Sequence, residues 1–114
     1  MKTLDLIFRE QDRSTFERIQ RGDKTIETRA GLPEYLIVED GDQLNISCGT
    51  DHLTKTVVKA LHFKTIEELL QKFSPEDIMP AGTTREQVIA KWNSFPNYPE
   101  RIKKYGIIVW KLKW

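Results

Sequence analysis

The sequence predicts an α+β domain: a small, mostly antiparallel β-barrel of five or six strands, with two to four helices packed alongside. Two observations predict this class. Apolar and polar residues alternate with a period of two, as in strands with one buried face, in residues 3–8, 43–48, 56–63 and 107–114. At several places Ser or Thr stands three residues before Glu or Gln, the pattern that caps the N-terminus of a helix.

The first strand is followed by a helix and then by an extended segment. Ser14 with Glu17 predicts the start of the helix, and Gly22 predicts its end in the left-handed conformation. The next residues, 24–29, are rich in Thr and Ile, which favour extended backbone.

The middle of the chain is richer in turns. We interpret residues 30–42 as a loop with a short strand or extended piece, and Gly41-Asp42 as a turn before the strand 43–48. A turn at residues 49–51 then leads to the long strand 56–63.

Helical signals dominate residues 65–106. They are a helix capped by Thr65 with Glu68, a turn of helix begun by Ser74-Pro75, a break at residues 79–82, a helix capped by Thr83 with Glu86 or by Thr84 with Gln87, and a helix from Pro99 to the glycine stop at Gly106. The strand 107–114 closes the chain.

The length and composition of the chain limit the class of protein to which it can belong. A chain of 114 residues with 39% hydrophobic and 31% charged residues is typical of one globular domain, so we expect a single domain over residues 1–114. The single cysteine, Cys48, excludes an intrachain disulfide framework, and its alternating surroundings predict a buried thiol. His52 and His62 form no cluster with it, so we expect neither a metal nor a cofactor.

The N-terminus lacks an apolar signal-peptide core, and no run approaches the roughly 18 apolar residues of a membrane span. We therefore expect a cytoplasmic protein with no membrane partner. The net charge of +1 divides unevenly: residues 1–54 carry 7 Lys and Arg against 11 Asp and Glu, and residues 55–114 carry 11 against 6. The excess is too small for a non-specific nucleic-acid binder.

The residues that carry the chemistry lie between Gly22 and Arg29. Lys24 and Arg29 offer donors to phosphate or carboxylate, and Glu27 is the nearest carboxylate partner for Lys24. On a regular strand Glu27 and Arg29 share a face while Lys24 points the other way, so convergence of all three requires the backbone to turn near Lys24. A Glu27–Arg29 pair that merely fixes the strand is the alternative.

The spacing of Gly22, Lys24, Glu27 and Arg29 resembles the signature of the ASCH domain, a family of PUA-like β-barrels. The resemblance extends along nearly the whole chain through Gly41-Asp42, the helix at residues 65–70 and the closing strand that begins at residue 105. It implies a cleft beside the barrel lined by Lys24, Glu27 and Arg29, with RNA or a nucleotide- or nucleoside-like molecule as the ligand.

Two other functions stay open. The wider group includes small amidohydrolases that deacetylate a modified cytidine, and ribonuclease activity is associated with ASCH-like domains. Hydrolysis of an acylated nucleoside or of RNA is therefore the first alternative, with Lys24 and Glu27 as the catalytic residues. The amidohydrolases carry a threonine nucleophile three residues after the lysine, where this chain has Glu27. A structural or protein-interaction domain is the second alternative.

Aromatic residues supply one more candidate for the site. Trp92 and Phe95 share a helical stripe with apolar residues, which favours core packing, although stacking on a base is the functional alternative. Tyr98 falls in a stretch flanked by prolines, which we interpret as a loop. We therefore include Tyr98 with Lys24, Glu27 and Arg29 among the ligand-binding residues.

Overall fold

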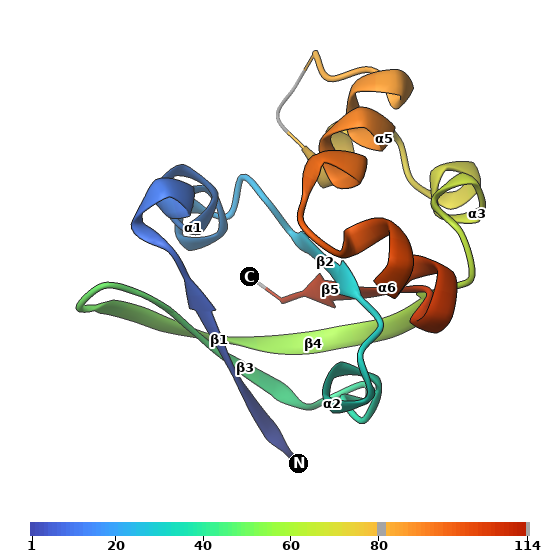
Figure 1. Ribbon diagram of the computed structural model, residues 1–114. Helices are drawn as coiled ribbons and strands as arrows, with labels where there is room; N and C mark the ends of the chain where they lie inside the picture. Colours follow the sequence, from blue (N-terminus) through green and yellow to red (C-terminus); the bar gives the residue numbers. More distant parts are fainter. Residues whose placement is uncertain (80–81, 114) are drawn as a thin grey trace. The chain divides into compact units, whose positions relative to one another are not determined.

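The computed structural model describes residues 1–79 and 82–113, and within them five strands and six α-helices (Figure 1). The strands are β1 (Thr3–Phe8), β2 (Ile26–Ala30), β3 (Gln43–Cys48), β4 (Asp51–Phe63) and β5 (Ile107–Leu112). The helices are α1 (Arg13–Arg21), α2 (Pro33–Leu36), α3 (Ile66–Lys72), α4 (Pro75–Ile78), α5 (Arg85–Ser94) and α6 (Tyr98–Tyr105), and a 3₁₀ turn at Glu10–Asp12 precedes α1.

The five strands form one sheet in the order β1-β3-β4-β5-β2. β1 runs parallel to β3, with Leu6 opposite Ile46, and β3 runs antiparallel to β4, with Ile46 opposite Leu53. The sheet as a whole is mostly antiparallel. The predicted class, α+β with a small barrel-type sheet and helices, is therefore confirmed, but the described residues form six α-helices where two to four were predicted, and two of the six, α2 and α4, have only four residues.

The chain divides into two compact units. The first comprises Met1–Glu27, Val38–Ala60 and the residues from Trp110 onward, and the second comprises Thr28–Ile37 and Leu61–Val109. In the first unit the alternation of β3 buries Leu44, Ile46 and Cys48 completely, as the sequence predicts. The single domain expected from chain length stays a prediction.

Two helix caps confirm the capping patterns in the second unit. The hydroxyl of Thr65 accepts a hydrogen bond from the backbone N–H of Glu68 at the start of α3. Of the two alternatives for α5, the structure has Thr84 as the cap, because its hydroxyl accepts from the N–H of Gln87 and the Gln87 side chain accepts from the N–H of Thr84.

The predicted cap at Ser14 is wrong. Helix α1 begins at Arg13, so the cap position is held by Asp12, two residues before Ser14, and Asp12 makes no side-chain bond to the helix. The physical reason is the 3₁₀ turn that runs directly into α1. The carboxylate of Asp12 accepts from the side chain of Arg9 instead, at 3.0 Å.

The turn between β3 and β4 is shorter than predicted. β4 begins at Asp51, not at residue 56, and Cys48 pairs directly with Asp51. Gly49 and Thr50 alone form the turn, and Gly49 has a φ of 60°. Glycine at the first central position is typical of a type II′ hairpin turn, which matches the twist of the flanking strands.

Two further corrections concern segments interpreted as loops. Residues 30–42 contain the short helix α2, which has Pro33 at its first position, where a missing N–H costs nothing. Tyr98 is the first residue of α6 and not part of a loop, and the residue before it, Asn97, has a φ of 66°.

The last strand ends at Leu112, two residues before the predicted end. The predicted break at residues 79–82 includes Pro80 and Ala81, and the predicted last strand includes Trp114; these three residues lie outside the described part of the chain. In the described part, no helix has the length and apolar character that crossing a membrane requires.

Candidate functional site

The segment from Gly22 to Arg29, called the signature segment below, begins at the C-terminal end of α1. Gly22 has a φ of 82°, as predicted, and its N–H donates to the carbonyl oxygen of Ile19. The N–H groups of Asp23 and Lys24 both donate to the carbonyl oxygen of Arg18, at 2.9 and 3.1 Å. These bonds form a Schellman motif extended by one residue. They place Lys24 in irregular backbone ahead of β2, so the backbone turns near Lys24, which is the condition set for convergence of the three side chains.

The side chains of Lys24 and Glu27 are buried. The residues are 5% and 6% exposed, and with Asp42 they are the charged residues buried in the described chain. The prediction that Glu27 is at least partly buried is confirmed. A charge removed from water loses hydration energy, which only polar or ionic contacts recover, and neither residue is without such an interaction.

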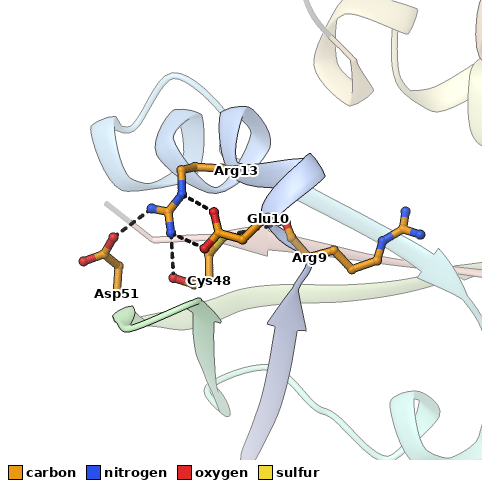
Figure 2. Close-up of polar contacts among 5 residues, drawn as sticks. All are labelled: Arg9, Glu10, Arg13, Cys48 and Asp51. Carbon is orange, nitrogen blue, oxygen red and sulfur yellow. Dashed lines mark hydrogen bonds and ion pairs between the residues drawn. The ribbon is translucent and has the colours of Figure 1, made fainter.

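The opposite end of α1 is fixed by Arg13 (Figure 2). Its guanidinium donates to both oxygens of Glu10, at 2.7 and 2.8 Å, and to the carboxylate of Asp51, at 2.7 Å. It also donates to the carbonyl oxygen of Cys48, at 3.1 Å. One side chain therefore ties the start of α1 to the β3–β4 hairpin, and the end of the same helix holds Lys24.

Contacts around the hairpin leave little room for movement of this anchor. Cys48 is buried, and its thiol donates to the carbonyl oxygen of Arg9 at 3.6 Å. A Cβ atom on Gly49 would lie 2.5 Å from Oε1 of Glu10, too close for any other residue without a shift of that side chain. The two carboxylates beside Arg13 are accordingly held against the guanidinium.

Two of the predicted ligand-binding residues line one pocket in the second unit. Arg29, on β2, and Tyr98, at the start of α6, are both half-buried there. The remaining lining residues are Thr28, Ala30, Trp92, Ile102 and Ile107. The space between these side chains is too narrow to admit a water molecule, so a ligand would have to displace side chains to enter it.

The aromatic residues near this pocket differ in exposure. Trp92 is buried, as the core interpretation predicts, yet it contributes to the pocket lining. Phe95 is half-buried and packs edge-to-face against Tyr98, with ring centroids 5.0 Å apart. The amphipathic stripe of α5 could have identified Trp92 as a helix residue but not as part of a pocket wall. Thr28, between Glu27 and Arg29, carries no sequence signal of its own.

The structure thus describes the signature residues in two groups. Lys24 and Glu27 are buried in the first unit, and Arg29 lines a pocket with Tyr98 in the second. A single cleft lined by all of them stays a prediction. Across the described residues, no three His, Cys, Asp or Glu side chains are grouped so that they could hold a metal ion.

Comparison with known proteins adds information on the fold. No family model matches the chain, and a search of curated proteins finds no match. The crystal structure of hypothetical protein PH0355 is similar, with a TM-score of 0.81 and 23% sequence identity over 97% of each chain. The solution structure of protein PF0455 from Pyrococcus furiosus has a TM-score of 0.73 and 22% identity, over 97% of this chain and 96% of that one. At this level of identity the similarity establishes the fold alone.

Proposed function

We propose that this protein is an ASCH-type domain that binds single-stranded RNA, a nucleotide or a nucleoside-like molecule through Lys24, Glu27, Arg29 and Tyr98. The observation that carries the proposal is the burial of Lys24 and Glu27 directly after the end of α1. Buried ionic groups are often no better for stability than apolar residues of similar size. Lys24 and Glu27 occupy two positions of the ASCH-like signature, so their burial there supports a functional role.

The chemistry of these four side chains suits such a ligand. A lysine ammonium and an arginine guanidinium both donate to phosphate oxygens, and the planar fork of Arg29 allows two parallel bonds. Tyr98 offers an aromatic ring for stacking on a base. Residues 24–29 form one continuous segment of the chain.

The small net charge supports local recognition over bulk attraction. With an excess of +1 the chain can neutralise few phosphates at once. For a single strand, the slope of log affinity against log salt is about −0.7 per phosphate contacted, so two to four contacts correspond to a slope between roughly −1.4 and −3. A non-specific binder would show a steeper slope.

The test is a titration of short RNAs, nucleotides and modified nucleosides against the wild type and Lys24→Met. Methionine keeps about the length of the lysine side chain and removes its charge. Lys72→Met is the matched control, because Lys72 is exposed on α3. Lys2 is a poor control, since its ammonium lies 3.2 Å from Asp42. We expect Lys24→Met to weaken binding by about 1–3 kcal/mol and the control to change it little. Unchanged binding of every ligand by folded Lys24→Met would exclude the site.

Hydrolysis of an acylated nucleoside or of RNA is the second candidate. The observation that favours it is again the burial of Lys24 and Glu27, because a buried amine and carboxylate are candidates for general acid–base catalysis. The same proteins are incubated with acetylcytidine and with labelled RNA. Turnover that disappears in Lys24→Met would establish an enzyme. If no ligand is turned over or raises the melting temperature, a protein-interaction role is favoured instead, since ligands specific for the folded state must stabilise it.

A further inference from the structure

A second surface feature lies wholly within the first unit. Strands β1, β3 and β4 form a groove of about 420 Å³, within the usual range of about 300–1,000 Å³ for small-molecule sites. Its lining residues are Asp5, Ile7, Asn45, Ser47, His52, Leu53 and Thr54. None of these belongs to the segment from Gly22 to Arg29.

Strand register explains why these side chains meet. Asp5 lies opposite Asn45, which lies opposite Thr54, and in the next row Ile7 lies opposite Ser47, which lies opposite His52. Residues directly opposite one another point to the same face of the sheet, and so do residues two apart on a strand. The two rows therefore form a continuous patch on the face opposite the buried residues Leu6 and Ile46.

Hydrogen bonds within the first row fix what it offers to a ligand. The hydroxyl of Thr54 donates to Oδ1 of Asn45 at 3.0 Å, and Nδ2 of Asn45 donates to Oδ1 of Asp5 at 3.2 Å. Because the hydroxyl proton of Thr54 is used in this way, its oxygen faces a ligand as an acceptor. The ionised carboxylate of Asp5 is also acceptor-only. This row is accordingly rich in acceptors and has been ordered before a ligand arrives.

Charge and apolar surface narrow the ligand further. Asp5 is the single charged residue in the lining of the groove, which includes no lysine or arginine. A phosphate or carboxylate would meet like charge there, whereas an ammonium brings three donors and no acceptor. Ile7 is 77% exposed on the groove, so methylene groups attached to the ammonium would be removed from water against it.

We propose that this groove is a binding site for an alkylammonium group, with the cation at Asp5 and Thr54 and the aliphatic chain against Ile7. A free aliphatic amine and the side chain of a lysine share this chemistry. The proposal does not depend on the function proposed for Lys24, because the groove takes no residue from the signature segment.

The experiment is an NMR titration of the full chain with 1,4-diaminobutane and, separately, with N-acetyl-lysine methylamide, following the amide signals of β1, β3 and β4. The neutral isostere 1,4-butanediol is the ligand control. We expect saturable shifts confined to the groove for at least one amine and none for the diol, and an affinity that falls as salt is added. The ratio of the two amine affinities tells whether a free amine or a lysine side chain fits better.

Variants separate the charge from the apolar wall. Asp5→Asn keeps an oxygen to accept from Asn45 and should weaken amine binding about 3- to 10-fold. Ile7→Thr keeps a β-branched residue on the strand, removes apolar surface, and should weaken it about 2- to 4-fold. Glu67→Gln is the control, because it also removes one negative charge, at an exposed position on α3. It should leave amine binding unchanged. Equal binding by Asp5→Asn and the wild type, or equal binding of the diol and the diamine, would overturn the proposal.

Discussion

The backbone N–H of Lys24 donates to the carbonyl oxygen of Arg18 at 3.1 Å, so the last turn of α1 holds the residue on which the proposed function depends. The same carbonyl also accepts from Asp23. A change in how α1 ends should therefore affect both stability and the position of the Lys24 side chain.

Gly22 gives the first prediction. Its φ of 82° lies in the left-handed region, where a Cβ atom meets the following carbonyl oxygen. We expect Gly22→Ala to lower the free energy of unfolding by about 1–2 kcal/mol and Gly22→Asn to lower it less, because asparagine tolerates this conformation. Urea unfolding followed by circular dichroism measures both. Equal losses in the two variants would show that backbone conformation is not the cause.

Arg13 gives the second prediction. A lysine at this position cannot reproduce the fork that reaches Glu10, Asp51 and the Cys48 carbonyl together. We expect Arg13→Lys to lower the melting temperature more than Arg9→Lys, since the exposed Arg9 side chain bonds to near neighbours in sequence, such as Asp12. Amide exchange in the β3–β4 hairpin should become faster in Arg13→Lys alone. A melting temperature equal to that of Arg9→Lys would contradict this role.

Asp42 gives a prediction on pH dependence. Its carboxylate accepts from the backbone N–H groups of Lys2 and Glu39, both at 2.8 Å, and lies beside the ammonium of Lys2. These bonds, that of Lys2 first, lower the pKa of Asp42 from 3.8 to about 2. Because the folded state favours the ionised form, the stabilisation is fully present above about pH 4 and is lost as the pH falls toward 2.

We therefore expect the urea concentration at the unfolding midpoint of the wild type to decrease as the pH is lowered from 5 to 2. The midpoint of Asp42→Asn should decrease less. Asp40 contributes a pH dependence of the same sign, since the hydrogen bond from the N–H of Ala60 lowers the pKa of the Asp40 carboxyl. The comparison is made at constant ionic strength, with Asp5→Asn as the control. Identical pH dependence in the wild type and Asp42→Asn would refute the assignment.

The parts of the fold that the sequence predicted are those in which burial alternates. β3 buries every second residue, and its bounds match the predicted 43–48. The first half of β4 escaped detection because Val57 is its only buried residue among the 13 described for this strand, so no apolar period marks Asp51 to Lys55. Helix α2 has four residues, too few to show a helical period.

The candidate site was accessible from the sequence in part. The segment from Gly22 to Arg29 was recognisable by its spacing, and the turn before β2 follows from the glycine. The groove on β1, β3 and β4 was not recognised, because register pairs Asp5 with Asn45 and Thr54 across 40 and then nine residues of sequence. Local patterns show which face a residue occupies but not its neighbours on adjacent strands.

The last prediction tests whether Glu27 is the partner of Lys24. Both side chains are buried, and a buried charge whose partner is removed is destabilising, whereas removal of both charges is tolerated better. We expect Lys24→Met and Glu27→Gln each to lower the free energy of unfolding, and the double variant to lose less than the two losses combined, by about 0.5–3 kcal/mol. Lys24→Met with Glu67→Gln is the control cycle and should be additive within about 0.5 kcal/mol. An additive result for Lys24 with Glu27 would assign the lysine another partner, and the signature would then act through separate charges.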